Sequence, residues 1–398
     1  MNLLIKKFVT SKDGGDGRKR RELCGRLSGA TGIGLNLLLG VIKLFVGFIS
    51  GSIAVMADAV NNLSDAAASI ITLVGFSLAA RRSDEGHPFG HARIEYMTGI
   101  LVSALIIIIG FVLVLQSYQK IISPEPLTVS AVAVVLLILP IGVKLWMFFF
   151  NKKLASLIGS ASLKATSIDS RNDVIVNSGV LASLLLWRFG GILIDGYVGV
   201  AIGVFVIYSG IGLIRETAAP LLGQPPDPQT VREIIELIKS EQDVVGFHDL
   251  IVHEYGPEHD FATVHIEVDA SKNIFKLHEM IDRIEQEALD RYRVQLVGHM
   301  DPVDVNDPKL NGLRETLTRA LKGSPGFLGF HDLRIIPGSG RTNVVFDIVV
   351  SHDAPEKSFE EAKRRAQKAL NSAAKDGERL TVVANCDLNY VPGWTAHP

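Results

Sequence analysis

Residues 56–76 read MADAVNNLSDAAASIITLVGF, and they place four polar side chains at the start of an apolar run. Asp58, Asn61, Asn62 and Asp65 lie within ten positions of one another, and the residues that follow continue like a membrane helix. A bilayer imposes a large free-energy cost on such side chains, so those found inside a membrane usually face the interior of a helix bundle and have a function. The stretch therefore predicts a membrane helix with a functional polar face.

The composition concentrates apolar residues in the first half of the chain. Of 398 residues, 47% are hydrophobic and 21% are charged, and the mean hydropathy is +0.29. A soluble protein of this length would show a smaller apolar excess. The net charge of −2 provides no basic field for nucleic acid, so we expect no such partner. Cys24 and Cys386 lie at opposite ends of the chain, which argues against a disulfide framework or a cysteine metal cluster.

The apolar residues fall into blocks that predict a bundle of six transmembrane helices. A helix needs about 20 residues to cross a hydrocarbon core of about 30 Å, and each block is long enough. The blocks lie at about 28–50, 53–80, 95–118, 127–150, 155–187 and 192–214. Blocks two and five are unusual because both carry carboxylates within the apolar frame.

Basic residues predict which side of the membrane each loop faces, because cytoplasmic loops carry an excess of lysine and arginine. The N-terminal tail, the loops after blocks two and four, and the end of block six are rich in basic residues. The opposite loops hold only Lys120 and Arg188. We therefore expect both termini to be cytoplasmic.

After a proline-rich linker at 220–229, the sequence has the composition of a soluble α/β domain, and its pattern occurs twice. The motif GFHDL is found at 246–250 and again at 329–333. The expected elements are helix 229–241, strands 247–255 and 260–269, helix 274–291, strand 294–300, helix 308–323, strands 330–337 and 342–351, helix 355–374 and strand 380–388. This repeat predicts a tandem α-β-β-α-β unit. The predicted domains are a basic cytoplasmic tail and a transmembrane domain, followed by two cytoplasmic copies, at 1–27, 28–217, 222–304 and 305–398.

Two pairs of polar residues stand four positions apart, one pair on each of the unusual helices. Residues four apart lie on the same face of a helix, so Asn61 and Asp65 form one pair and Asp169 and Asp173 the other. Side chains from both helices could surround one divalent cation, whereas burying three carboxylates without a cation would be very unfavourable. The alternative is that these residues cap or hydrogen-bond helices, or that the polar part of block five lies outside the membrane.

Several motifs, in this order, resemble the cation diffusion facilitator family of metal transporters. SGSIAVMADAVNNLSDAAAS is similar to the second helix of that family, DEGHPFGHARIEY to the loop that follows it, and LKATSIDSRNDVIVNSG to the fifth helix. GFHDL, VHIEV, LHEM and GHMDP resemble the cytoplasmic domain. The resemblance covers about residues 28–304. It implies an all-α six-helix membrane bundle followed by a cytoplasmic α/β domain of ferredoxin-like, metallochaperone-like fold. The second copy goes beyond the usual family architecture.

The resemblance carries the transport site of the family onto Asn61, Asp65, Asp169 and Asp173. Zinc members typically have a histidine in one of the two pairs, and this chain has none in either block. An all-oxygen set favours a hard cation, and this set is similar to that of the manganese branch. The expected substrate is therefore Mn²⁺, followed by Fe²⁺ and then by Zn²⁺ or Cd²⁺. The family exchanges metal for protons, which carboxylates can hold when no metal is bound.

A second candidate metal site lies in the loop DEGHPFGHAR. Asp84, His87 and His91 have a spacing that could put three ligands on one metal, and several members of the family bind metal in this loop. Taken by itself, the loop could equally be solvated without a metal.

A third candidate site lies in the first cytoplasmic copy, where the resemblance implies a binuclear site that helps to hold two subunits together. The matching residues are His248, His265, His278, His299 and Asp301. The alternative is that they are ordinary hydrogen-bonded surface histidines.

The second copy keeps only part of this set. His331 and Asp387 remain at the corresponding places, whereas Asp347 and Asn385 stand where the first copy has His265 and His299. We expect this copy to have lost the full site and to serve packing or partner recognition.

Three lysines lie in or near the apolar blocks. Lys144 and Lys164 are expected to extend toward the membrane interface, as long cationic side chains do. Lys43 lies deeper, and we expect it to pair with an intramembrane acid such as Asp58.

Together these observations predict a multi-pass protein of the cell (plasma or inner) membrane that exports divalent metal by proton antiport as a homodimer. Its expected partners are metal cations, protons and the lipid bilayer. No prosthetic group is expected, and metal serves as substrate and as a structural ion. With no Walker A or phosphorylation motif, the sequence shows no route to ATP as a driving force. The predicted protein is a transporter, and we expect no enzymatic activity. The alternative from another functional class is a membrane-anchored metal sensor or scaffold that does not transport.

Overall fold

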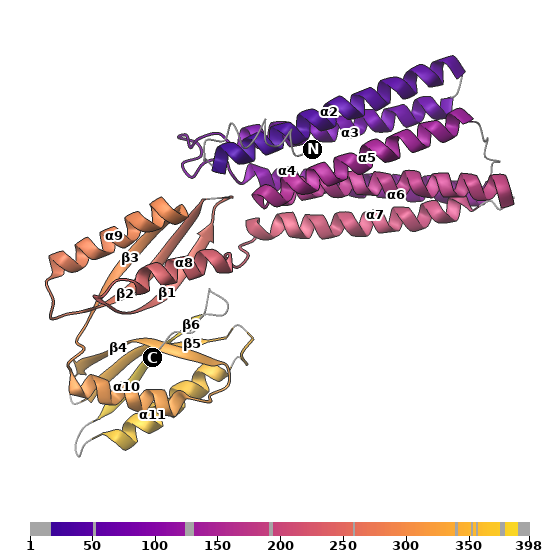
Figure 1. Cartoon of the computed structure of the whole chain (residues 1–398). Helices are drawn as coiled ribbons and strands as arrows, with labels where there is room; N and C mark the ends of the chain where they lie inside the picture. The colour runs from indigo at the N-terminus through magenta and orange to yellow at the C-terminus, as the bar shows by residue number, and fades with distance from the viewer. Residues whose placement is uncertain are drawn as a thin grey trace. The chain divides into compact units, whose positions relative to one another are not determined.

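Figure 1 shows the chain as a computed structural model, which describes residues 17–50, 53–123, 131–190, 194–257, 259–338, 341–351, 353–355, 357–374 and 379–388. A few side chains within these ranges, among them those of Asp58 and Asn61, lie outside the description. The chain divides into two compact units, and the main division falls between Gln224 and Pro225.

The first unit is a bundle of long helices that run side by side (Figure 1). The helices are α2 Gly17–Ser50, α3 Ile53–Ala79, α4 Ile94–Ile122, α5 Ala131–Ile158, α6 Ala161–Gly190 and α7 Asp195–Ala218, followed by the 3₁₀ turn η2 Ala219–Leu221. Among the described residues, five stretches are long and apolar enough to cross a membrane: Gly17–Val46, Asn62–Ala79, Ile94–Ile122, Ala161–Gly190 and Gly196–Leu221. This architecture confirms the helical membrane domain predicted from the sequence.

The helix boundaries differ most from the predicted ones at the end of α5 and at the start of α2. The predicted fourth block stops at residue 150, whereas α5 continues to Ile158. The chain turns at Gly159, whose φ of 57° is a left-handed conformation that glycine adopts at no steric cost. At the other end, α2 begins inside the predicted tail. Arg21 in this first part of α2 donates to Glu95 of α4 at 2.8 Å, so it packs with the bundle.

The outer faces of the helices are apolar, and the interior contains polar groups. Large apolar side chains such as Phe45, Phe111 and Tyr208 are exposed, whereas Asn36 and Asn172 are buried. Soluble proteins rarely expose contiguous apolar surface on this scale. This distribution is the one expected where lipid surrounds the bundle and polar side chains can be satisfied only inside it.

Helices α4 and α7 approach each other closely through glycines. A Cβ atom placed on Gly203 of α7 would lie 2.6 Å from a methyl carbon of Val114 and 3.1 Å from the carbonyl oxygen of Gly110, both on α4. Small residues at such a contact allow two helix backbones to pack in lipid, where little hydrophobic driving force acts between helices.

We therefore expect Gly203→Ala to destabilise the bundle by about 1–3 kcal/mol relative to Gly212→Ala, because overpacking has a cost of this size. Gly212 lies on the same helix and has no atom within 4 Å of the equivalent Cβ position, so the general helix-forming benefit of alanine cancels in the comparison. Thermal unfolding of both variants in detergent measures the difference. Equal midpoints would contradict the close packing of α4 on α7.

The second unit contains two copies of one α-β-β-α-β unit. The first copy consists of α8 Pro228–Lys239, β1 Val244–Glu254, β2 Asp260–Asp269, α9 Ile274–Tyr292 and β3 Val294–Val303. The second consists of α10 Pro308–Leu321, β4 Phe327–Gly338, β5 Arg341–Val350, α11 Ser358–Ala373 and β6 Leu380–Leu388. In each copy the middle strand pairs antiparallel with the first strand and parallel with the last. Each sheet packs against its two helices in a separate apolar core, which confirms the predicted elements.

The same local signals start the two copies. Asp227 and Asp307 each precede a proline, and their carboxylates accept hydrogen bonds from backbone N–H groups of the following helix. An aspartate N-cap followed by proline is a strong helix start, because the carboxylate satisfies a free N–H and proline removes another.

The first strands of the two copies also share an irregularity. The register of β1 shifts between His248 and Ile251, and that of β4 shifts between His331 and Arg334. The aspartate of each GFHDL motif lies in this bulge with a positive φ, 51° in one copy and 54° in the other. Bulges redirect side chains at the edges of sheets. Here Asp249 contacts His331 of the second copy, whereas Asp332 pairs with Arg334.

Candidate metal sites

Three carboxylates meet in the interior of the helical unit. Asp65 comes from α3, and Asp169 and Asp173 come from successive turns of α6. One oxygen of each carboxylate lies within 4.8 Å of one from each of the others. The two helices also touch between Thr72 and Thr166, whose hydroxyl oxygens are 3.4 Å apart. The cluster therefore unites three of the four predicted transport residues, while the side chain of Asn61 lies outside the described residues.

Lys144 of α5 belongs to this cluster, which contradicts the expectation that it extends to the membrane interface. Its side chain is only 4% exposed, and its Nζ atom lies 2.7 Å from Asp65 Oδ2 and 2.6 Å from Asp173 Oδ2. Breaking a buried ion pair of this kind is strongly destabilising, because it leaves a charge without compensation. The ammonium group therefore neutralises part of the negative charge of the three carboxylates.

The predicted interfacial position of Lys144 was wrong because the C-terminal end of the helix was predicted eight residues too early, at residue 150 and not at Ile158. With the block ending at residue 150, the lysine lies close to a helix end. The helix in the structure has 28 residues and continues to Ile158, so Lys144 lies at its midpoint. A lysine at the middle of a membrane helix cannot reach the interface, and it must find a partner inside the bundle.

The other two lysines also have defined partners. Lys43 is buried, and its Nζ atom donates to Asn62 Oδ1 at 2.9 Å, whereas the side chain of the expected partner, Asp58, lies outside the description. Lys164 is exposed and pairs with Glu216 at 2.7 Å. This surface pair agrees with the predicted interfacial position of Lys164.

The predicted loop residues Asp84, His87 and His91 lie together between α3 and α4. His87 Nδ1 is 3.4 Å from Asp84 Oδ1, and His91 Nε2 is 3.5 Å from Asp84 Oδ2. The backbone N–H of His87 also donates to the Asp84 carboxylate, which lowers the pKa of Asp84. The loop thus presents three possible ligands within reach of one ion, on an exposed turn that a cation can approach.

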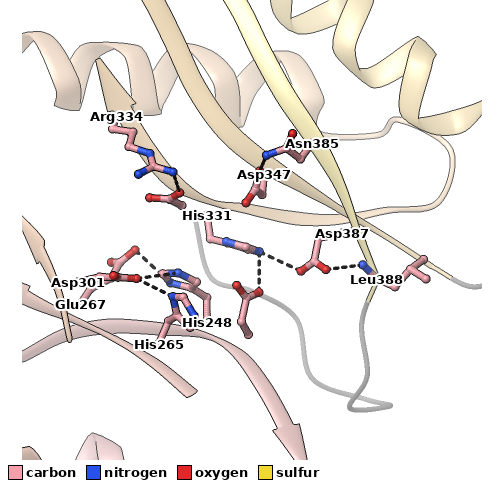
Figure 2. A network of polar contacts seen from close by, with 12 residues as sticks. His248, His265, Glu267, Asp301, His331, Arg334, Asp347, Asn385, Asp387 and Leu388 are labelled. Carbon is pink, nitrogen blue, oxygen red and sulfur yellow. Dashed lines mark hydrogen bonds and ion pairs between the residues drawn. The ribbon is translucent and has the colours of Figure 1, made fainter. Parts of the chain in front are cut away.

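A cluster of histidines lies across the first cytoplasmic sheet, and Figure 2 shows two of them, His248 and His265, beside Asp301. The strand register places His248 of β1 opposite His265 of β2, and His265 opposite His299 of β3. Asp301 connects them: its Oδ2 is 2.9 Å from His265 Nδ1 and 3.3 Å from His248 Nε2, and its Oδ1 is 3.2 Å from His299 Nε2. Three of the four predicted histidines therefore meet around the fifth predicted residue, Asp301.

His278 lies apart from this group. It is exposed on α9 and pairs with Asp282 of the same helix at 3.2 Å. Among the described residues it belongs to no group of possible metal ligands. Within one chain the cluster therefore contains His248, His265, His299 and Asp301.

The second copy brings a second group against the first. His331 of β4 stacks on His248, with ring centroids 4.4 Å apart and an interplanar angle of 17°. Its Nε2 lies 3.1 Å from Asp249 Oδ1 of the first copy and 3.2 Å from Asp387 Oδ2 of its own copy. The sequence did not identify Asp249 as a possible metal ligand, although it belongs to the repeated GFHDL motif. In the first copy Glu267 was missed as well, and its Oε1 lies 3.5 Å from His248 Nδ1.

The ion pairs around His331 shift the pKa values of its group. Burial would lower the pKa of His331, but hydrogen bonds with Asp249 and Asp387 outweigh it and raise the pKa to about 10. The same contacts overcome burial at Asp249 and lower its pKa to about 2. The histidine contributes its stabilisation below its unfolded pKa of 6.5 and loses it as the pH rises through 10. The aspartate contributes above 3.8 and loses it as the pH falls through 2. In the metal-free protein these pairs are therefore intact at neutral pH.

Comparison with known proteins supports the assignment made from sequence and geometry. Residues 30–222 match a family model described as the cation efflux transmembrane domain. Residues 226–303 match the model ZT_dimer, described as the cytoplasmic domain of cation efflux proteins. The matched segments cover α3 to α7 in full and the whole first cytoplasmic copy, and they end before α10.

Individual relatives give the same result. The chain is 28% identical over 269 residues to the cation-efflux pump FieF of Escherichia coli K12 / DH10B, an alignment that covers 67% of this chain and 89% of the relative. The FieF protein of Escherichia coli O157:H7 aligns with the same identity and coverage. With a bundle of long helices, three clustered carboxylates inside it and a histidine-rich cytoplasmic sheet, the chain is a membrane protein of the cation diffusion facilitator family, and therefore a metal cation efflux transporter and not an enzyme.

Proposed function

We propose that this chain exports a divalent cation from the cytoplasm in exchange for protons, with Mn²⁺ as the preferred substrate. The observation that carries the proposal is the convergence of Asp65, Asp169 and Asp173 inside the helical unit. All three donors are carboxylates, and oxygen donors suit Mn²⁺, whereas imidazole is a frequent ligand of Zn²⁺. Asn61 is the proposed fourth ligand, and Fe²⁺ and then Zn²⁺ or Cd²⁺ are the alternative substrates.

The charges in direct contact support a simple exchange. With all three carboxylates ionised, they and the Lys144 ammonium would carry a net charge of −2 before any other ion binds. One divalent cation would neutralise that charge, and so would two protons. Exchange of one for the other would keep the buried charge near zero in both states, which a low-dielectric interior favours. Lys144 therefore has the proposed role of matching the cluster to a divalent ion.

The cation path and the topology follow from the distribution of charge. We place both termini on the cytoplasmic side of the plasma or inner membrane, because arginines such as Arg81 and Arg82 lie exposed at one end of the helices. The Asp84, His87 and His91 loop adjoins them and would receive the cation first. Cations at the cytoplasmic histidine cluster would be structural, and the match to ZT_dimer supports a homodimer through this domain.

Uptake of Mn²⁺, Fe²⁺ and Zn²⁺ into proteoliposomes that enclose a pH-sensitive dye tests the function directly. We expect Mn²⁺ to enter fastest and protons to move in the opposite direction. Transport of Zn²⁺ in preference to Mn²⁺ would overturn the substrate, and cation flux without proton movement would overturn the antiport. No flux despite tight cation binding would favour a membrane-anchored sensor or scaffold.

Selectivity should change when nitrogen enters the ligand set. We expect Asp169→His to raise the ratio of Zn²⁺ to Mn²⁺ transport several-fold, because imidazole binds Zn²⁺ well and Mn²⁺ poorly. Initial uptake rates for the two ions in the same liposomes give the ratio. Asp169→Asn is the control, since it removes the same charge without adding imidazole. An unchanged ratio in the histidine variant would locate selectivity elsewhere.

A further inference from the structure

We propose that the two cytoplasmic copies form a metal site between them, in which Asp249 from the first copy and His331 and Asp387 from the second bind one divalent transition-metal ion. This site adjoins the His248, His265, His299 and Asp301 cluster, because Asp249 also lies within 4.8 Å of His248 and His265, and it differs from the carboxylate cluster in the helical unit. Its consequence is that a bound metal would join the two copies within one chain.

The distances around His331 fit one coordination sphere. Metal–nitrogen and metal–oxygen bonds of about 2.0–2.2 Å place neighbouring ligand atoms about 3.0–3.4 Å apart in octahedral or tetrahedral geometry. The distances from His331 Nε2 to Asp249 Oδ1 and Asp387 Oδ2 are 3.1 and 3.2 Å. All three ligand atoms lie within 4.8 Å of one another. A direct charge-assisted hydrogen bond would be shorter, about 2.7–2.9 Å.

Two carboxylates face the same nitrogen atom of His331, and this arrangement also favours a metal. Nε2 can carry at most one proton, yet carboxylates from both copies face it. One divalent cation would satisfy the nitrogen and both oxygens together, whereas one proton can make only one good hydrogen bond.

Stacking of the two histidines adds a further constraint. His331 is 4% exposed and stacks on His248, which is 2% exposed, at a centroid distance of 4.4 Å. The stacking fixes the orientation of the His331 ring, with its Nε2 atom facing Asp249 and Asp387.

A cavity between the copies reaches His331. A cavity of about 490 Å³ is lined by residues of both copies, among them His248, Glu267, Arg314 and His331. The donor set of one imidazole and two carboxylates suits borderline and moderately hard divalent ions such as Zn²⁺, Fe²⁺, Co²⁺ and Mn²⁺.

The divergence of the second copy agrees with this assignment. Its sheet has lost the ligands that correspond to His265 and His299, and there Asn385 Nδ2 donates instead to Asp347 Oδ1 at 2.8 Å. The two possible ligands that remain, His331 and Asp387, are those within reach of Asp249 (Figure 2 shows the second-copy residues). The second copy thus keeps His331 and Asp387, the two possible ligands that face Asp249 of the first copy.

The test is the number of Zn²⁺ ions bound per full-length chain, measured by elemental analysis after equilibrium dialysis in detergent. We expect His331→Gln and Asp387→Asn each to lose one equivalent relative to the unmodified protein. Asp347→Asn is the matched control, because it changes a carboxylate on the same sheet outside the cluster, and it should lose none. The same loss should be found in an Asp173→Ala background, so the result does not depend on transport.

The alternative is that a protonated His331 alone holds the copies together as an ion pair. In that case His331→Gln would lower stability without changing the number of ions bound, which overturns the proposal. If His331→Gln does not fold, as judged by gel filtration and circular dichroism, Asp249→Asn tests the site from the first copy. An undiminished ion count in that variant would equally overturn it.

Discussion

Asp173→Ala should reduce cation transport to the background of protein-free liposomes, while the protein still folds and dimerises. Asp173 supplies one of three clustered carboxylates and also pairs with Lys144 at 2.6 Å. Loss of a residue that merely orients a metal ligand lowers metal affinity or activity about 10–100-fold. Loss of a ligand itself should exceed that range. Initial rates of Mn²⁺ uptake, normalised to the amount of folded protein, measure the effect.

A control for this experiment removes a carboxylate elsewhere in the same unit. Glu216 is exposed and pairs with Lys164 at the surface, so Glu216→Ala should leave uptake nearly unchanged. Normal Mn²⁺ flux through Asp173→Ala would rule out the intramembrane carboxylates as the transport site. Loss of flux in both variants would show that uptake responds to general damage.

Lys144→Met should produce the second large effect, because it removes the positive charge from the centre of the cluster. The side chain is 4% exposed and contacts both Asp65 and Asp173. Removing one partner of a buried ionic group destabilises a protein by about 3–5 kcal/mol. We expect the metal-free variant to unfold at a lower temperature and to bind Mn²⁺ more tightly than the unmodified protein, since three carboxylates then lack a counter-charge. Tighter binding should slow release and reduce turnover.

Thermal unfolding with and without saturating Mn²⁺ separates this role from simple packing. A ligand that binds only the folded state raises the unfolding temperature by an amount that grows with affinity. The increase should therefore be larger for Lys144→Met than for the unmodified protein or for Lys144→Arg, which keeps the charge. Lys164→Met serves as the control for loss of a lysine in the same unit. Equal increases in Lys144→Met and the unmodified protein would contradict a role for Lys144 at the cation site.

Much of the fold could be predicted from the sequence, because it depends on local patterns. Apolar block lengths predicted the long helices, and alternation with turn residues predicted the strands, including both limits of β2 and β6. The repeat of GFHDL predicted two copies with the same order of elements. Helix ends were predicted less accurately, because the φ of 57° at Gly159 decides where α5 ends and a run of apolar residues does not contain that information.

The candidate sites divide in the same way. The i, i+4 pairing of Asp169 and Asp173 follows from helix geometry alone, so the sequence was sufficient to find it. Strand alternation likewise indicated that His265 and His299 could share a face. His278 shows the limit, because a motif match says which residue types are present and not whether one chain brings them together.

By its sequence alone, this protein is determined to have a helical membrane unit with carboxylates on two of its helices and two cytoplasmic α/β copies, since periodicity and spacing act over a few residues. Only the tertiary structure decided that Lys144 reaches Asp65, 79 positions away, and that Asp249 crosses to His331 of the other copy. Those contacts depend on how each helix is rotated in the bundle and on how two cores pack together. Helix rotation and core packing both depend on many contacts between residues far apart in the sequence, so no short stretch of sequence predicts them.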